Sequence, residues 1–466
     1  MFPRVFILFL TLGITPSLGL MNLGPSHLAS QTERLTNPVQ GDVGLPLILT
    51  PYIETGDIET ARNLSSVAGG PFSNDVLSFS GYFTVNKDYN SNLFVWFFPA
   101  QNNYENAPVI LWLEGGPGTS GLFTLFNEFG PYFIKDDLSL RENPYSWHRN
   151  YSVIFVDNPV GTGFSFTNND TGYAEDETQV GTELYTMLIQ FFKIFSELQT
   201  LPFYIAGESY GGKYVPALGH AIHQLNPTAE LKLNLQGLMV GNGLTDPINM
   251  VDYSTLLYEL GLVDTNTYQR MHSLEDECRQ ATQEGNYVDA YNTLQQVLLL
   301  LFSSTHYTSY FNFLYPDMPP QMSMLYMTFV EQPEVRAAIH VGDSEYSDGS
   351  TVRTRMIPDI MVSVKPWLEE LLDNYRVMYY SGQLDIVVAY AFSVNMYNNL
   401  QFGAAQEYKK AERLPWYVNG ELAGYTKTAG NFTEVLVRNA GHIVAVDQPA
   451  WLLDLISKFI SSTLVL

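Results

Sequence analysis

The chain has 466 residues, of which 46% are hydrophobic, and its 48 acidic side chains outnumber 23 basic ones, giving a formal net charge of −25 at pH 7. This length and apolar content allow a large buried core, in one big α/β domain or in two or three smaller ones. The negative charge repels phosphate backbones and anionic lipid, which argues against nucleic acid and membrane surfaces as partners, and it suits an acidic compartment.

The first 19 residues, "MFPRVFILFLTLGITPSLG", contain one basic residue, an apolar run and small residues at a plausible cleavage point. This pattern predicts a signal peptide, because the apolar run is too short to span a bilayer. Residues 20–45 are polar and rich in turn formers, and we expect a loosely ordered segment or a removable pro-region. Four Asn-x-Ser/Thr sequons fit a secretory route and predict glycosylation at Asn63, Asn150, Asn169 and Asn431.

Short apolar runs recur along the chain, and their near-continuous hydrophobicity is typical of strands that are buried on both faces of a parallel sheet. The runs begin at Val109, Tyr151, Phe203, Leu235, Arg376 and Glu434. Between them, residues 176–198 carry apolar side chains at a spacing of three to four, which predicts a helix with one apolar face. Strands that alternate with helices predict an α/β fold.

The strand rhythm stops between residues 246 and 358, where helical, polar composition takes over. We expect an inserted helical subdomain or lid there, with the core divided into residues 46–245 and 359–466. The apolar stretch "VLLLLF" at residues 297–302 is too short to cross a membrane and predicts a helix face that packs on the core.

A possible nucleophile lies in "FYIAGESYGGKYVPAL", residues 203–218, where an apolar run leads into the glycine-flanked Ser209 and then into a helical pattern. Gly-x-Ser-x-Gly between a strand and a helix is the pattern of a nucleophile elbow, a tight turn that exposes the serine hydroxyl. By itself the string also fits an ordinary strand-to-helix turn.

Partners for Ser209 occur in the order that an α/β-hydrolase requires, an acid after a later strand and a histidine after the last one. Asp385 follows the strand that starts at Arg376, and His442 lies in a loop after the final strand. His442 would take the Ser209 proton, while Asp385 would fix the imidazole tautomer and stabilise the imidazolium. Taken singly, Asp385 could be a turn residue and His442 a surface or core histidine, but the joint order favours a triad.

The oxyanion hole of such a site needs two backbone N–H groups. One would come from Tyr210, and the other from the glycine-rich loop "LWLEGGPGTSG" at residues 111–121, where Gly115 and Gly116 follow a strand directly.

No metal or other cofactor is predicted. His220 and His223 lie three apart on a predicted helix, but neither an HExxH pattern nor a nearby third ligand accompanies them. The single cysteine, Cys278, excludes an intramolecular disulfide and is expected to be an incidental thiol.

Seven motifs in order resemble the serine carboxypeptidases, most closely their vitellogenic-like branch, from Pro46 to the C-terminus. They are "WLEGGPGTS", "DNPVGTGFS", "GESYGGKYVP", "GNGLTDP", "PEVRAAIHV", "SGQLDIVV" and "GHIVAVDQP". The resemblance implies an α/β-hydrolase fold with a helical insertion, a lysosomal or secreted location, and acid-pH release of single residues from peptide or protein C-termini by a monomer or homodimer.

By motif, the resemblance implies a triad of Ser209, Asp385 and His442, with Gly116 and Tyr210 forming the oxyanion hole. It further implies that the terminal carboxylate of the substrate is bound by Trp112, Glu114, Gly115, Glu128 and Glu208. A carboxyl–carboxylate hydrogen bond from Glu208 requires that Glu208 is protonated, so binding should fail as the pH rises.

The sequence departs from the family pattern at three positions. Glu114 stands where the family has Asn, or Gln in nearer relatives, while Thr119 replaces a common Cys and Gln383 an acidic residue. A glutamate donates a hydrogen bond only when protonated, so we expect a more acid-shifted optimum or weakened exopeptidase character. An esterase or acyltransferase on the same triad, and a binding or storage protein with a silent site, are the alternative interpretations.

Overall fold

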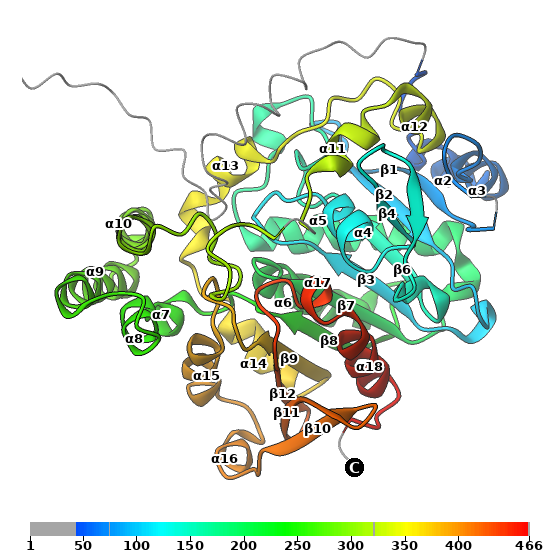
Figure 1. The fold of residues 1–466 in the computed structure, drawn as a ribbon. Coiled ribbons are helices and arrows are strands. Elements are labelled where there is room, and N and C mark those ends of the chain that lie inside the picture. The colour runs from blue at the N-terminus through cyan, green and yellow to red at the C-terminus, as the bar shows by residue number, and fades with distance from the viewer. Residues whose placement is uncertain (1–42, 74, 320–321, 465–466) are drawn as a thin grey trace, which may run out of the picture.

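The computed structural model describes residues 43–73, 75–319 and 322–464, in which helices surround one central sheet (Figure 1). The sheet has ten strands in the order β1-β2-β6-β3-β7-β8-β9-β12-β11-β10, and neighbouring strands from β6 to β12 are parallel. This arrangement confirms the predicted α/β-hydrolase fold. The predicted signal peptide and residues 20–42 lie outside the described residues.

The six parallel strands coincide with the six predicted apolar runs. They are β6 (Ser152–Val156), β3 (Val109–Leu113), β7 (Phe203–Glu208), β8 (Leu235–Gly241), β9 (Arg376–Gly382) and β12 (Phe432–Val437). Almost every residue in them is buried, as expected for strands that are covered on both faces.

Antiparallel strands that the sequence analysis did not predict complete the two ends of the sheet. β1 (Phe79–Asn86) and β2 (Ser91–Phe98) extend it beyond β6, while β11 (Glu421–Ala429) and β10 (Leu414–Val418) extend it beyond β12. A separate two-stranded sheet pairs β4 (Tyr132–Ile134) with β5 (Leu140–Glu142).

Helices cover the two faces of the sheet. On one face α6 (Gly211–Leu225) packs between α5 (Glu177–Ile194) and α14 (Lys365–Leu372), and a Cβ atom at Gly219 of α6 would lie 2.8 Å from Leu238 of β8. On the other face lies α18 (Pro449–Ile460), because a Cβ atom at Gly237, the residue of β8 before Leu238, would meet Phe459 at 3.4 Å. The predicted helix over residues 176–198 corresponds to α5, whose apolar stripe is buried.

The remaining elements of the core are short. They are α2 (Thr50–Thr55), α3 (Ile58–Ser65), α4 (Gly121–Asn127), α15 (Tyr390–Asn398), α16 (Ala405–Tyr408) and α17 (Val444–Asp447).

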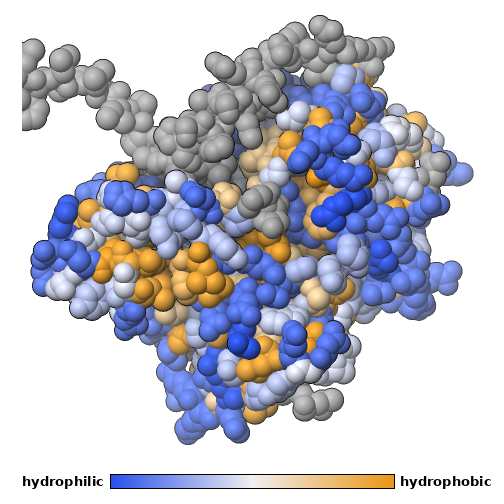
Figure 2. Space-filling model, viewed as in Figure 1, coloured by the Kyte–Doolittle hydropathy of each residue, from blue (hydrophilic) through white to orange (hydrophobic). Residues whose placement is uncertain are grey.

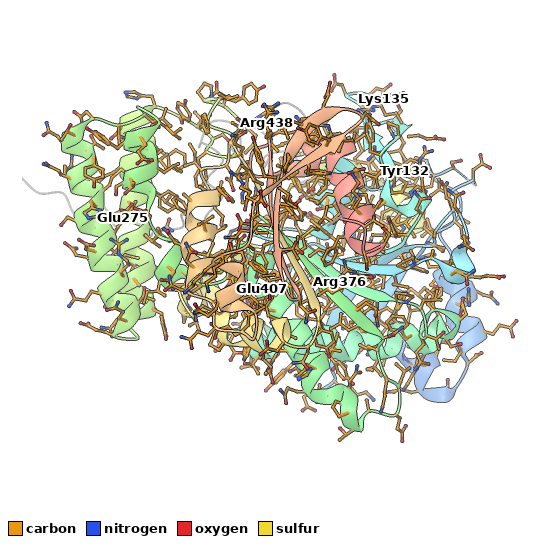
Figure 3. All side chains as sticks on the ribbon, turned by 90° about the horizontal axis from the view of Figure 1, so that it is seen from below. Tyr132, Lys135, Glu275, Arg376, Glu407 and Arg438 are labelled. Atoms are coloured by element: carbon orange, nitrogen blue, oxygen red, sulfur yellow. The ribbon has the colours of Figure 1, made fainter. Side chains whose placement is uncertain are left out.

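Residues 246–358 contain helices and, where described, no strand of the sheet. They form α7 (Pro247–Met250), α8 (Tyr253–Glu259), α9 (Thr265–Gln283), α10 (Tyr287–Thr305), α11 (Leu325–Val330), α12 (Pro333–Ala338) and α13 (Ser350–Ile360). The helices α7 to α10 stand to one side of the sheet, where the buried carboxylate of Glu275 on α9 accepts hydrogen bonds from Ser254 of α8 (Figures 1 and 3). α11 contacts α4 and β4 of the core instead, and α13 continues past Pro358 to Ile360.

The "VLLLLF" stretch lies in α10. Val297, Leu298 and Leu301 are buried, whereas Leu299 is 52% exposed. Apolar side chains gather on the visible face of the α7–α10 region (Figure 2). No helix within the described ranges combines the length and apolarity needed to cross a membrane.

Candidate active site

Ser209 lies in a sharp turn between β7 and α6 at the carboxyl edge of the parallel strands. Its φ of 57° falls in the left-handed region, a strained conformation for a residue with a side chain. The flanking glycines are required by close packing, because a Cβ atom at Gly207 or Gly211 would lie 2.5 or 2.8 Å from the carbonyl oxygen of Leu113. The strand–turn–helix context required of a nucleophile elbow is therefore present.

Asp385 and His442 meet in a buried hydrogen bond, with 2.9 Å between Asp385 Oδ2 and His442 Nδ1. The Asp385 carboxylate also accepts the backbone N–H groups of Val387 and Val388, at 2.7 and 3.2 Å. These bonds fix the carboxylate, so Nδ1 of the neutral imidazole carries the proton and Nε2 is left as the basic nitrogen.

His442 Nε2 is buried and has no hydrogen-bond partner among the described residues, so no bond joins it to Ser209. Catalytic hydrogen bonds are often long in a free enzyme and tighten when the substrate binds. The arrangement thus brings Asp385 and His442 together and leaves the basic nitrogen available.

The glycine-rich loop approaches the elbow closely. A Cβ atom at Gly115 would lie 2.7 Å from Ser209 Cβ and 2.8 Å from the Tyr210 nitrogen, so only glycine fits. Gly116, Ser209 and Tyr210 line one small cavity, which Val387 and Val388 also line. The predicted oxyanion donors therefore border the same space as the predicted nucleophile.

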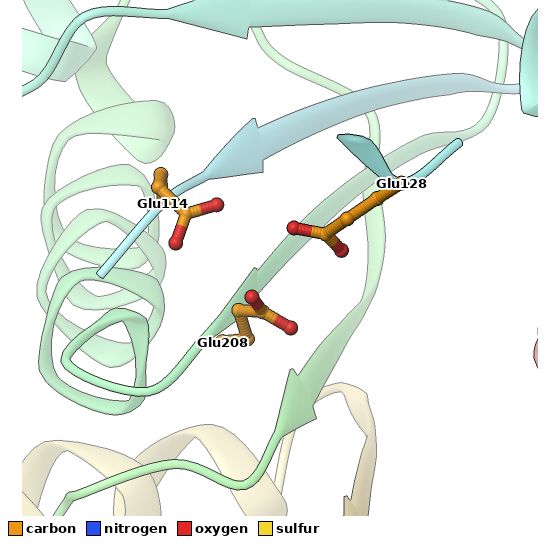
Figure 4. A group of neighbouring side chains, drawn as sticks. All are labelled: Glu114, Glu128 and Glu208. Carbon is orange, nitrogen blue, oxygen red and sulfur yellow. The ribbon is translucent and has the colours of Figure 1, made fainter. Parts of the chain in front are cut away.

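Three glutamates converge behind this turn. Glu114 follows β3, Glu128 follows α4, and Glu208 ends β7 (Figure 4). Each is at most 2% exposed, and one oxygen atom from each carboxyl group lies within 4.8 Å of the others. Burial raises the pKa of all three carboxyl groups, and the neighbouring carboxylates raise those of Glu128 and Glu208 further.

The contacts of the Thr124 hydroxyl group bear on the protonation state of this cluster. It accepts the indole N–H of Trp112 at 2.8 Å, and its oxygen is also within hydrogen-bond distance of Glu114 Oε2 and of Glu128 Oε1. A hydroxyl group has only one hydrogen to donate. At least one of the two carboxyl groups must therefore be protonated for both contacts to be hydrogen bonds.

Glu114 already uses two groups that were predicted to bind the substrate. Its Oε1 accepts the Gly115 N–H at 3.0 Å, and its Oε2 lies 3.3 Å from the Trp112 indole nitrogen. Glu128 Oε2 and Glu208 Oε1, by contrast, have no hydrogen-bond partner within the described structure. Both oxygen atoms of Glu114 thus have hydrogen-bond partners, whereas Glu128 and Glu208 each keep one oxygen atom without a partner among the described residues.

The spacing of the three glutamates is also compatible with a metal ion, which the sequence analysis did not predict. Near His220 and His223, Glu370 of α14 lies 2.8 Å from His220 Nδ1 and 3.7 Å from His223 Nε2, although these three side chains are not among the described groups whose spacing could hold a metal ion. The sequence separation of about 150 residues hid this neighbour.

A larger apolar cavity, of about 110 Å³, lies beside His442. Phe311, which stacks on His442, lines it together with Ile443, Gly118 and Phe123. Four methionines also line it: Met318, Met322, Met324 and Met327. The sequence analysis missed these residues because most come from the insertion, where no motif marks them.

Asp157, the first residue of the motif "DNPVGTGFS", is a further residue near the site whose role was not predicted from the sequence. Its buried carboxylate accepts the Ser120 hydroxyl at 2.5 Å and the backbone N–H groups of Gly121 and Phe164, at 3.1 and 2.8 Å. It thereby holds the end of the glycine-rich loop. Burial raises the pKa of Asp157 to about 7.

The sequons and the cysteine lie away from this centre. Asn63, Asn150 and Asn169 are exposed, whereas Asn431 is half-buried and donates a hydrogen bond to the Leu372 carbonyl at 3.0 Å. Cys278 is buried, and burial raises the pKa of its thiol to about 11, which keeps the thiol protonated.

The ten-stranded sheet with its covering helices, and the serine turn between β7 and α6, define an α/β-hydrolase. The family model "Serine carboxypeptidase" matches residues 70–462, and the chain belongs to the serine carboxypeptidase family, a family of peptidases. The enzyme is accordingly a serine-type carboxypeptidase and a hydrolase.

Relatives match over nearly their full lengths. The chain is 44% identical to a probable serine carboxypeptidase, CPVL, of Homo sapiens, over 95% of this chain and 96% of that protein. It is 45% identical to the vitellogenic carboxypeptidase of Aedes aegypti, over 90% of each. The crystal structure of Kex1Δp, a prohormone-processing carboxypeptidase from Saccharomyces cerevisiae, superposes with a TM-score of 0.76 at 23% identity, covering 86% of this chain and 96% of that one.

Proposed function

We propose that this enzyme releases single amino acids from the C-termini of peptides at acidic pH, through an acyl-enzyme on Ser209. The observation that carries the proposal is the cluster of three buried carboxyl groups directly behind the serine, since Glu208 is its chain neighbour. A buried, partly protonated cluster can donate hydrogen bonds to a carboxylate, which an endopeptidase or an esterase does not need.

In this mechanism, Ser209 Oγ attacks the carbonyl carbon of the last peptide bond while His442 Nε2 takes its proton. The N–H groups of Gly116 and Tyr210 stabilise the oxyanion. His442 then gives the proton to the leaving nitrogen, and the C–N bond breaks to release the terminal amino acid. Water, activated by His442, hydrolyses the Ser209 ester and restores the free enzyme.

The acidic optimum would follow from substrate binding. Protonated Glu208 and Glu128 have free oxygen atoms through which to donate to the terminal carboxylate, and the shared burial raises the pKa of both groups. As the pH rises these groups ionise and repel the substrate. Glu114 adds to this effect because its ionised carboxylate accepts the Gly115 N–H, which is then not available to the substrate carboxylate.

The apolar cavity beside His442 would hold the side chain of the released residue, because His442 must reach the leaving nitrogen and Ile443 and Phe311 adjoin it. Apolar C-terminal residues are then the favoured substrates. Val387 and Val388, on the serine side, border the space for the preceding residue.

The enzyme would act in an acidic compartment of the secretory pathway or outside the cell. The N-terminal apolar segment, three exposed sequons and the charge of −25 support this location. The proposal holds equally for a monomer and for a homodimer.

The test is to incubate an unmodified peptide with the enzyme at pH 5 and to follow its mass with time. Stepwise loss of C-terminal residues, abolished in Ser209→Ala, is the expected result. Internal cleavage, or acyl transfer without loss of terminal residues, would instead favour an endopeptidase or an acyltransferase on the same triad.

A further inference from the structure

Residues 241–244, the "GNGL" that begins with the last residue of β8, contact all three turns that carry the proposed triad. On the serine side, the Gly241 carbonyl accepts the Ser209 N–H at 3.0 Å, and the Leu244 N–H donates to the Ser209 carbonyl at 2.9 Å. The main chain of Ser209 is therefore held from both directions by one short segment.

The side chain of Asn242 makes the link to the other two turns. Its Oδ1 accepts the N–H of Gly382, three residues before Asp385, at 2.7 Å. Its Nδ2 donates to the carbonyl oxygens of Gly441 and His442, at 3.0 and 2.6 Å. The three bonds join the end of β9 to the histidine loop after β12, and the side chain is fully buried.

We propose that Asn242 is a positioning residue that sets the distance and angle between the Asp385–His442 pair and Ser209. This inference rests on the proposed triad. Asn242 does not touch the reacting atoms; it acts through the backbone of the two loops and of the serine turn. Because transition-state geometry tolerates little displacement, small shifts of these loops reduce the rate without altering substrate binding.

Only an amide side chain satisfies all three contacts, since one acceptor must face an N–H and one donor must face two carbonyls. The backbone at Asn242 has a φ of 42°, in the left-handed region that asparagine tolerates better than most residues. The main-chain N–H of Asn242 also donates to Tyr380 of β9 at 2.8 Å, so the residue cannot shift independently of the sheet.

Two substitutions test the inference. Asn242→Gly keeps the backbone conformation but removes the bridge, and we expect kcat to fall about 10- to 100-fold with KM changed by less than about threefold. The rate at which a fluorophosphonate probe labels Ser209 should fall in parallel. Asn419→Gly is the matched control, because Asn419 has a φ of 50° in the exposed turn between β10 and β11, and its kcat should not change.

Asn242→Asp gives a second, pH-dependent readout. An ionised carboxylate would face the two carbonyl oxygens that Nδ2 now serves, whereas the protonated form can donate to one of them. The ratio of its kcat to the wild-type kcat should therefore rise as the pH falls from 7 to 5.

Wild-type kcat in Asn242→Gly, a loss confined to KM, or a pH-independent ratio in Asn242→Asp would overturn the positioning role. These outcomes differ from failure of the proposed function, in which the wild-type enzyme itself would show no Ser209-dependent release of C-terminal residues.

Discussion

The aromatic ring of Phe311 stacks on the imidazole of His442, with 5.1 Å between ring centroids and 13° between planes. The backbone carbonyl oxygen of Phe311 also accepts the backbone N–H of His442 at 2.6 Å. Phe311 belongs to the segment between residues 246 and 358. The insertion therefore packs directly against the proposed catalytic histidine.

Removing this aromatic contact should slow the reaction. In Phe311→Leu the ring is lost while most of the apolar volume remains, so the imidazole gains rotational freedom and we expect kcat to fall about three- to tenfold. Steady-state kinetics at pH 5 measures the effect. Leu299→Ala, at an exposed position of α10 in the same insertion, is the control, and equal kcat values for the two variants would contradict the role.

Replacing Glu114 should extend activity toward neutral pH. Burial raises the pKa of this carboxyl group, and its ionised form holds the Gly115 N–H, whereas the amide of Glu114→Gln can donate at every pH. We expect the upper limb of the kcat/KM profile to move toward pH 7, with about a tenfold gain there. Glu183→Gln, which replaces a buried carboxyl group on α5, is the matched control and should leave the profile unchanged. An unaltered profile in Glu114→Gln would contradict the prediction.

The folded enzyme should be more stable in acid than at neutral pH. Burial raises the pKa of Glu183 from 4.5 to about 7 and that of Asp157 from 3.8 to about 7, so between these values the folded chain holds protons that the unfolded chain has lost. The stabilisation that each group contributes is therefore fully present below its unfolded pKa. Between the unfolded pKa and the folded pKa of about 7, the unfolding free energy falls by about 1.4 kcal/mol per pH unit for each group. Calorimetry should show Tm decreasing from pH 5 to pH 7, less steeply in Glu183→Gln, and a rising Tm would contradict the account.

Lys213 should be essential for stability. Its ammonium group is fully buried beneath the serine turn, where it donates to the carboxylate and the carbonyl of Asp359. Lys213→Met leaves the Asp359 charge without this partner, and we expect a loss of about 3–5 kcal/mol of unfolding free energy in urea at pH 5.

The control for this variant is Lys365→Met, which removes a partly exposed pair with Glu369 at 2.6 Å and should cost less than about 1 kcal/mol. Comparable losses of unfolding free energy in the two variants would show that the buried pair stabilises the fold no more than the partly exposed pair does.

The parallel strands were predictable because strands buried on both faces, such as β3 and β7, must be apolar throughout. The antiparallel ends were not predicted. The turn between β10 and β11 did carry a signal, since Asn419 and Gly420 both have positive φ, as expected for an Asn-Gly hairpin turn. The last helix of the insertion, α13, ends at Ile360, two residues beyond the expected boundary at residue 358.

The sequence motifs identified the residues of the candidate site, but not the side chains that contact its carboxyl groups and histidines. Thr124 carries no sequence signal, because its role depends on facing Glu114 and Glu128 from the first helix after the glycine-rich loop. Glu370 and Phe311 likewise reach their histidines from more than 100 residues away. Such pairs follow from the packing of the fold and not from local pattern.

The most direct test of the account compares hydrolysis of a blocked dipeptide that has a free C-terminal carboxylate with that of its C-terminal amide, from about pH 4 to pH 7. We predict that the free acid is cleaved best at low pH and the amide poorly, because Glu128 and Glu208 would bind the terminal carboxylate only while protonated. If amide or ester substrates are preferred at every pH, the carboxyl cluster does not recognise peptide C-termini, and the central claim is wrong.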